Sequence, residues 1–280
     1  MITEFLNSWS LFGPSYLTAL AGAVLLSLVG VFVVARDQVF LAAAVSQSSM
    51  LGVACALFLG WENPALLPVA FSVGAAIFIN HRASRGGVSH QETTGWVFLL
   101  ASALSILLLV KQPFSVKQVQ ALTSSTMIGA TARDAGLFAA LGLGLMGLVF
   151  VQRPRLVLWL SDPVMAAAVG MRIGLWSLGA AVALGLGAGL MLRSTGLLFT
   201  FGCLVLPALA AKNLSRDVST MFWLSPLAAV AGVLPGMVLA HHFDLPPGQV
   251  IVVVLAFLAA LGVLLRSLRE TLGRQVSLLP

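Results

Sequence analysis

The feature that most constrains this chain is a series of long apolar runs, with the charged side chains confined to the stretches between them. A run of about 20 apolar residues is long enough to cross the hydrocarbon core of a bilayer as a helix. We expect membrane segments at 14–35, 38–60, 64–80, 95–110, 134–152, 173–192, 197–211, 219–240 and 248–265. The sequence therefore predicts an all-α, polytopic membrane protein with eight or nine segments, which form a single domain over residues 1–280.

Composition agrees with this prediction. The chain is 59% hydrophobic and 9% charged, and its mean hydropathy is +1.04. So few charged side chains could not cover the surface of a soluble protein of this length. The formal net charge of +6 indicates basic cytoplasmic loops rather than binding to nucleic acid. The N-terminus has no basic region of the kind that precedes a cleaved signal peptide, and Cys55 and Cys203 lie in apolar runs, where we expect reduced thiols.

Some segments allow more than one interpretation. The stretch 197–211 is short and contains Pro207, so it either spans the membrane or re-enters it. The stretch 114–130 is amphipathic and polar, and is expected to lie at the interface or to be partly inserted. The sixth segment is rich in glycine and alanine, which favours close packing of helices, either inside one subunit or across a dimer. Pro226 and Pro235 fall inside the eighth segment and allow kinks there.

The distribution of Lys and Arg predicts the orientation of the chain in the membrane. If the N-terminus is outside, 11 of the 15 basic residues fall on the cytoplasmic side: Arg36, Arg82, Arg85, Arg153, Arg155, Arg172, Lys212, Arg216, Arg266, Arg269 and Arg274. Cytoplasmic loops carry such an excess of positive charge. We therefore expect the N-terminus outside and, with nine spans, the C-terminus inside.

The apolar segments lack the residues that several membrane proteins need. All nine acidic residues fall in loops or at segment ends, whereas ion-coupled carriers usually keep an ionisable group within the membrane. An aspartyl protease would need paired carboxylates, a zinc metalloprotease an H-E-x-x-H pattern, and an ATPase a G-x-x-x-x-G-K-[ST] loop. We therefore expect no enzymatic activity and no cofactor, and any energy for transport would come from another subunit.

One cytoplasmic loop contains a short predicted helix. In "SDPVMAAAVGM", Asp162 is suited to cap a helix and Pro163 to occupy its first position. The residues that follow are mostly small, and Gly170 closes the segment. A short helix without bulky side chains, parallel to the membrane surface, can enter a cleft in a soluble partner. An ordinary interfacial helix would have the same composition.

Several stretches, in order, resemble the permease subunits of zinc/manganese-type metal-uptake ABC transporters. They are "GVFVVARDQVF" (30–40), "SSMLGVACALFLG" (48–60), "SDPVMAAAVGM" (161–171), "STGLLFTFGCLVLPALAA" (194–211) and "HHFDLPPGQVIVVV" (241–254). The resemblance implies a homodimer in the bacterial cytoplasmic membrane, with an ATPase inside and a substrate-binding protein outside. It also implies that the ATPase docks on a coupling segment formed by Asp162, Pro163, Val164, Met165, Ala166, Ala167 and Gly170.

The chain departs from this family at the expected metal ligands. The family usually carries D-T-L-A-H-S before the L-L-G-V-A stretch of its second helix, and the positions of Asp and His correspond here to Ala43 and Gln47. These two positions lie four apart, on one helical face. The resemblance thus places a translocation pathway along Ala43, Ser46, Gln47 and Met50, with neutral polar groups and a soft thioether in place of charge and imidazole.

The polar stretch has a structural interpretation as well. Small serines allow helices to approach closely, and Gln47 can hydrogen-bond a neighbour. His241, His242 and Asp244 are weak candidates for a metal site, because adjacent helical residues diverge by about 100°. His81 and His90 are expected to be solvated loop residues. The sequence thus predicts an ABC permease for a transition metal; a permease for a metal chelate or another solute, and a secondary carrier, are the alternatives.

Overall fold

A computed structural model describes residues 2–60, 66–84, 89–110 and 130–276, and every regular element in this part of the chain is an α-helix. The helices are α1 (Ile2–Ala35), α2 (Val39–Leu59), α3 (Leu66–Ser84), α4 (His90–Val110), α6 (Ala132–Ser161), α7 (Pro163–Ala168), α8 (Ile173–Thr195), α9 (Leu197–Leu214), α10 (Val218–His242) and α11 (Pro247–Val276). The predicted interfacial segment 114–130 lies almost entirely outside the described residues.

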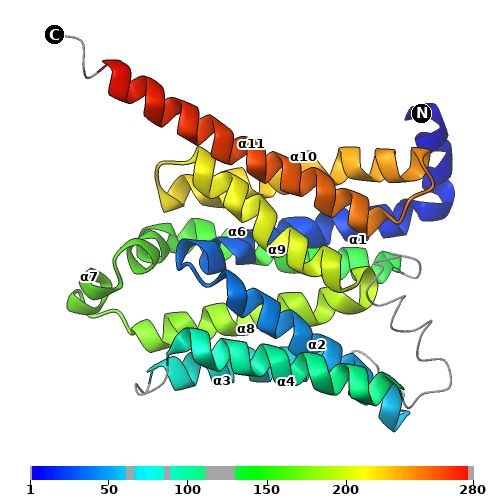
Figure 1. Ribbon diagram of the computed structural model, residues 1–280, viewed down its shortest axis with the longest axis horizontal. Helices are drawn as coiled ribbons and strands as arrows, with labels where there is room; N and C mark the ends of the chain where they lie inside the picture. Colours follow the sequence, from blue (N-terminus) through cyan, green and yellow to red (C-terminus); the bar gives the residue numbers. More distant parts are fainter. Residues whose placement is uncertain (1, 61–65, 85–88, 111–129, 277–280) are drawn as a thin grey trace.

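The long helices lie side by side in two groups (Figure 1). In one group α1 packs against α6, α9 and α10, and α11 packs against α9 and α10. In the other group α2 packs against α3 and α4, and α3 packs against α8. Contacts of α2 and α8 with α1 and α9 join the two groups. Helix α7 and the end of α11 lie at one end of the bundle and the start of α1 at the other (Figure 1).

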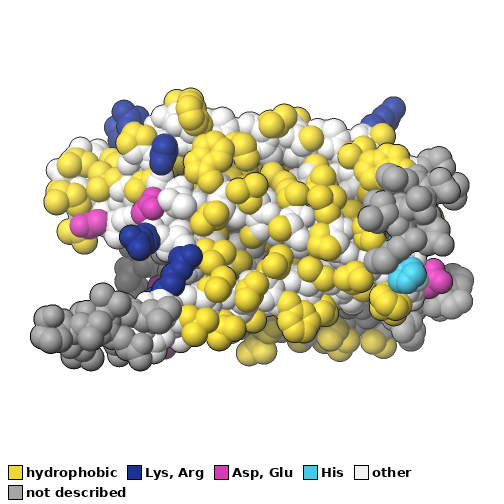
Figure 2. All heavy atoms as spheres, turned by 90° about the horizontal axis from the view of Figure 1, so that it is seen from above, with side chains coloured by type: hydrophobic (Ala, Val, Ile, Leu, Met, Phe, Trp, Pro, Cys, Tyr) yellow, Lys and Arg dark blue, Asp and Glu magenta, His cyan; other side chains and the backbone are white. Residues whose placement is uncertain are grey.

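Eight of the described helices are long and apolar enough to cross a membrane. The ninth, α3, has a shorter apolar part, Leu66–Arg82, so the prediction of eight or nine segments is confirmed. Figure 2 shows hydrophobic side chains over the middle of one face and charged side chains towards its two ends. Helix α9 is continuous over 18 residues in spite of Pro207 and is one of the eight, which favours the spanning interpretation of 197–211.

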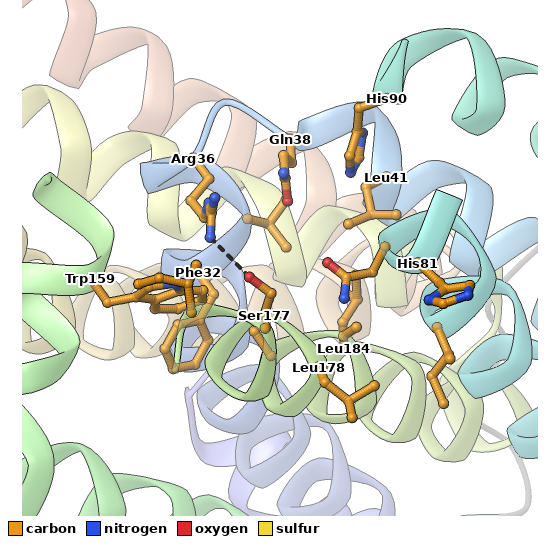
Figure 3. Close-up of a pocket in the computed structure, with 17 residues that line it drawn as sticks. Phe32, Arg36, Gln38, Leu41, His81, His90, Trp159, Ser177, Leu178 and Leu184 are labelled. Atoms are coloured by element: carbon orange, nitrogen blue, oxygen red, sulfur yellow. Dashed lines mark hydrogen bonds between the residues drawn. The ribbon is translucent and has the colours of Figure 1, made fainter. Parts of the chain in front are cut away.

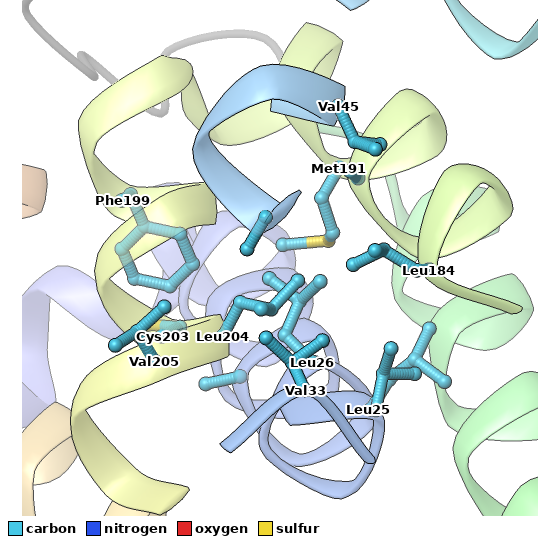
Figure 4. Packing of buried hydrophobic residues seen from close by; sticks show 14 of the residues in the cluster. Leu25, Leu26, Val33, Val45, Leu184, Met191, Phe199, Cys203, Leu204 and Val205 are labelled. Atoms are coloured by element: carbon cyan, nitrogen blue, oxygen red, sulfur yellow. The ribbon is translucent and has the colours of Figure 1, made fainter. Parts of the chain in front are cut away.

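The core lies where α1, α2, α8 and α9 meet. Figure 4 shows Met191 of α8 among side chains that include Val45 of α2 and Leu204 of α9, all of them buried. Because lipid tails are as apolar as these side chains, close packing rather than burial from water holds such helices together. The junction of α1, α2, α8 and α9 therefore fixes the position of α2 from one side.

The glycines of the sixth predicted segment bring α8 close to α3. A Cβ atom added at Gly185 would lie 2.5 Å from Cα of Val73, and one added at Gly189 would lie 2.7 Å from Cα of Val69. The hydroxyl of Ser72 donates a hydrogen bond of 2.7 Å to the carbonyl of Gly185. The predicted close packing is confirmed, and its partner is α3.

Helix α6 extends nine residues beyond the predicted end at 152, through Pro154 to Ser161. Leu156 and Trp159 lie on this extension and are buried. They pack against helices that are distant in the sequence, and this packing stabilises the extra turns. A count of apolar residues along the chain cannot predict such contacts. As a result α6 leads directly into α7.

Candidate functional site

Helix α7 has the start and the end that its sequence predicts. The carboxylate of Asp162 accepts a hydrogen bond of 2.9 Å from the backbone N–H of Met165, and Pro163 occupies the first turn. Gly170 has a φ of +83°, in the left-handed region where a side chain would be strained. These local interactions stabilise the short helix α7, of six residues, between α6 and α8.

The surface of α7 is exposed and apolar. The exposed fractions of Val164, Met165 and Val169 are 78%, 52% and 61%, and Ala167 is exposed as well. Ala166 alone is fully buried; it belongs to the same core cluster as Trp159 of α6. One side of α7 is thus anchored to the bundle while the others are free to meet another protein.

The polar stretch of α2 divides into two faces. Ala43 and Gln47 are half-buried, whereas Ser46, Ser48 and Ser49 are buried. The hydroxyl of Ser48 bonds to the carbonyl of Ala44 at 2.8 Å. The hydroxyls of Ser46 and Ser49 have no hydrogen-bond partner in the described structure. Ala43 and Gln47 therefore form the more accessible side of this stretch, which we call its open side.

Met50 lies on the buried side. It belongs to a cluster with Val53, Leu109 of α4 and Leu192 of α8, and its exposed fraction is 4%. In this conformation its thioether packs between helices. The four residues expected along the pathway are thus separated, with Ala43 and Gln47 open and Ser46 and Met50 enclosed.

The histidine pair near the end of α10 does not gather a third ligand. His242 is exposed and its ring meets that of Phe243 edge-on, with 5.0 Å between the centroids. Asp244 is exposed in the turn that follows, with a φ of +50°. Within the described ranges no three His, Cys, Asp or Glu side chains, these and His241 included, come together as a metal site.

A cavity of about 460 Å³ opens at the α7 end of the bundle. Figure 3 shows its walls, which come from α1, α2, α3, α4, α6 and α8. Its polar lining residues are Arg36, Gln38, Asn80, His81, His90 and Ser177. The prediction that His81 and His90 are loop residues is wrong: His81 is in the last turn of α3, and His90, half-buried, begins α4. The predicted apolar run of α3 ends before His81 and that of α4 begins after His90, so neither run indicated that these residues are helical.

Arg36 is fixed in the wall of this cavity. Its guanidinium carbon lies 4.9 Å from the centroid of the Trp159 ring, and one of its N–H groups donates to the hydroxyl of Ser177 at 3.4 Å. Burial lowers the pKa of this guanidinium, because a low-dielectric environment disfavours the charged form. The neighbouring carboxylate of Asp37 turns away to bind Lys212 of α9 at 2.5 Å.

Comparison with known proteins gives a consistent match. The family model described as the ABC 3 transport family matches residues 9–266. Over 281 residues the chain is 23% identical to the manganese import system permease protein ScaB of Streptococcus gordonii. The aligned region covers 99% of this chain and 100% of ScaB. It is 27% identical over 196 residues to the manganese transport system membrane protein MntB of Synechocystis. This alignment covers 69% of this chain and 63% of MntB.

Two solved structures share the fold. The structure of PsaBC from Streptococcus pneumoniae in complex with a Fab aligns with a TM-score of 0.80 and 21% identity, covering 94% of this chain and 95% of that one. An inward-facing metal-chelate type ABC transporter aligns with a TM-score of 0.75 and 17% identity, covering 94% and 89%.

Proposed function

The chain belongs to the ABC 3 transport family, and from this premise we propose that it is the permease of an ABC importer for a transition-metal cation, with Mn²⁺ as the first candidate and Zn²⁺ as the second. The observation that carries the proposal is the full-length match to a manganese import permease. The chain is a multi-pass protein of the bacterial cytoplasmic membrane. It would catalyse no covalent chemistry itself.

The energy for transport would come from a separate ATPase that docks on α7. Its exposed apolar side chains, Val164, Met165 and Val169, suit insertion into a cleft of that subunit. Because Ala166 anchors α7 to the bundle, a displacement of the ATPase would move the neighbouring ends of α6 and α8. Such a movement could switch the pathway between the two sides of the membrane.

The substrate would pass along the open side of α2, at Ala43 and Gln47. In the proposed two-fold dimer, this side of α2 would face the route between the two copies. The amide of Gln47 offers neutral hydrogen bonds, so a hydrated cation would be held weakly and released readily. Selectivity would then rest with a substrate-binding protein on the outer face.

A metal chelate is a second candidate substrate. Ala43 and Gln47 stand where the family usually has a carboxylate and an imidazole, and neither can hold a bare cation tightly. A chelate brings its own ligands and needs only neutral polar walls. This observation favours the chelate over other solutes and over a secondary carrier.

Transport by the complete complex would test both candidates. The chain, its ATPase and its binding protein would be reconstituted in vesicles and supplied with radioactive Mn²⁺, Zn²⁺ or a preformed ferric chelate. We expect Mn²⁺ uptake that requires ATP and the binding protein. Uptake of the chelate alone would replace the first candidate by the second, and uptake without ATP would overturn the proposal.

A further inference from the structure

The cavity beside α7 contains a cation, Arg36, that has no anionic partner in the described part of the chain. Among the residues that the structure describes, Arg36 interacts with Trp159 and Ser177, neither of which carries a negative charge. The nearest carboxylate in sequence, Asp37, is occupied by Lys212. A charge that is partly removed from water is costly unless it is paired. A bound anion next to Arg36 would therefore be stabilised.

The walls around Arg36 suit such a ligand. Among the residues that the structure describes, no acidic side chain lines the 460 Å³ cavity. The amides of Gln38 and Asn80 and the hydroxyl of Ser177, which line it, can all donate hydrogen bonds. A second hollow shares Arg36, Gln38 and His90 with the first, so these residues stand at the boundary of a larger recess. Asp37 also lines the second hollow, but its carboxylate is paired with Lys212. The charge of Arg36 is therefore left unbalanced, which makes the recess unsuitable for holding a metal cation.

Arg36 is also held in place by two neighbouring side chains. Its guanidinium is stacked over the ring of Trp159, which is itself buried, and is tied to Ser177 (Figure 3). A planar guanidinium that is already immobilised binds phosphate or carboxylate through two parallel hydrogen bonds and loses little further side-chain entropy. We propose that this recess is an oxyanion site, which binds a phosphate group at the cytoplasmic end of the bundle.

Two sources could supply that phosphate: a free phosphate in the cytoplasm or the head group of an anionic phospholipid. In either case the occupant would bridge the turn between α1 and α2 to the ends of α3, α4 and α8. The proposal is independent of the transported substrate, since it concerns the cytoplasmic end of the bundle rather than the open side of α2.

The test uses the full chain without its ATPase, because an ATPase binds phosphate itself. In phosphatidylcholine nanodiscs, inorganic phosphate is titrated by calorimetry at constant ionic strength. In discs that contain phosphatidylglycerol, lipid retained by the protein is measured by native mass spectrometry. Saturable binding in the first experiment indicates free phosphate; selective retention of phosphatidylglycerol in the second indicates lipid.

Matched variants decide whether the recess is responsible. Arg36→Gln should weaken the binding by about tenfold or more, whereas Arg82→Gln, which removes an exposed charge at the end of α3, should change it by less than about twofold. Equal effects of the two variants, or no binding in either experiment, would overturn the proposal.

A second pair of variants leaves Arg36 in place. Gly174 lines the same cavity, and a side chain added there would meet nothing within 4 Å. Gly174→Asp supplies an internal carboxylate and should abolish the binding, while the neutral Gly174→Asn should retain it. Retention of binding by Gly174→Asp in a folded protein would count against the site.

Discussion

Helix α7 and the polar stretch of α2, the two proposed functional regions, differ in what holds their side chains in place. The conformation of α7 depends on its own sequence: Asp162 caps it, Pro163 begins it and Gly170 ends it. The stretch of α2 depends on its neighbours, because α3, α4, α8 and α9 pack around it. A substitution on the surface of α7 therefore tests contact with a partner, whereas one in α2 also tests packing.

The largest expected effect is that of a bulky side chain on α7. Ala167→Trp should lower the rate of ATP hydrolysis measured with the binding protein by about tenfold or more. The bulky ring on the surface of α7 would prevent close contact with the ATPase. The thermal stability of the chain should not change, since Ala167 is exposed. The control is Ala139→Trp on the exposed surface of α6. Normal stimulation by Ala167→Trp would mean that the ATPase docks elsewhere.

The next effect concerns the open side of α2. Gln47→Leu should slow transport by about tenfold while the complex stays assembled, because a hydrophobic collar resists the passage of a hydrated solute. Gln47→Asn, which keeps the amide, should retain most of the rate. Uptake into vesicles and size-exclusion chromatography would be measured on the same preparations. If Gln47 only packs against a neighbour, the leucine variant will transport normally.

A smaller effect is expected when the usual ligand types are introduced. The double variant Ala43→Asp/Gln47→His places a carboxylate and an imidazole four residues apart, on the half-buried side of α2. Without metal, the carboxylate should destabilise the chain by up to about 3 kcal/mol. Added Mn²⁺ should restore the melting temperature, and Ala43→Asn/Gln47→His should show no such response. A melting temperature that is insensitive to Mn²⁺ would show that the two side chains do not face a common space.

The smallest effect is the loss of the cap on α7. Asp162→Ala removes the hydrogen bond to the N–H of Met165 and should weaken the helix by about 1 kcal/mol. Amide exchange in α7 should then be faster by roughly fivefold, while Asp162→Asn should keep the slow rate. Equal exchange rates in the alanine variant and the wild type would show that the bundle, rather than the cap, holds α7.

The sequence predicted what depends on neighbours along the chain. The number of membrane segments and the start and end of α7 follow from apolar runs and from Asp162, Pro163 and Gly170, each of which acts within a few residues. The close packing of the sixth segment was predicted from its glycines, although its partner α3 was not.

Long-range packing accounts for what the sequence did not predict. Helix α6 continues to Ser161 because the ring of Trp159 packs at a tilt against those of Phe32 and Trp176, with 6.3 Å between ring centroids in each case. The cavity around Arg36 lies where the ends of six helices meet, so no pattern of neighbouring residues in the sequence predicts it. Helical spacing pairs Ala43 with Gln47, but only the positions of the neighbouring helices determine which side of α2 is open.

The most direct test of the account is to measure ATP hydrolysis and Mn²⁺ uptake together for Ala167→Trp and Gln47→Leu in the reconstituted complex. The account predicts that the α7 variant loses both activities, because the ATPase no longer docks. It predicts that the α2 variant keeps stimulated ATP hydrolysis and loses uptake, because only the pathway is altered. Normal Mn²⁺ uptake by both variants in assembled complexes would contradict the assignment of coupling to α7 and of the pathway to α2.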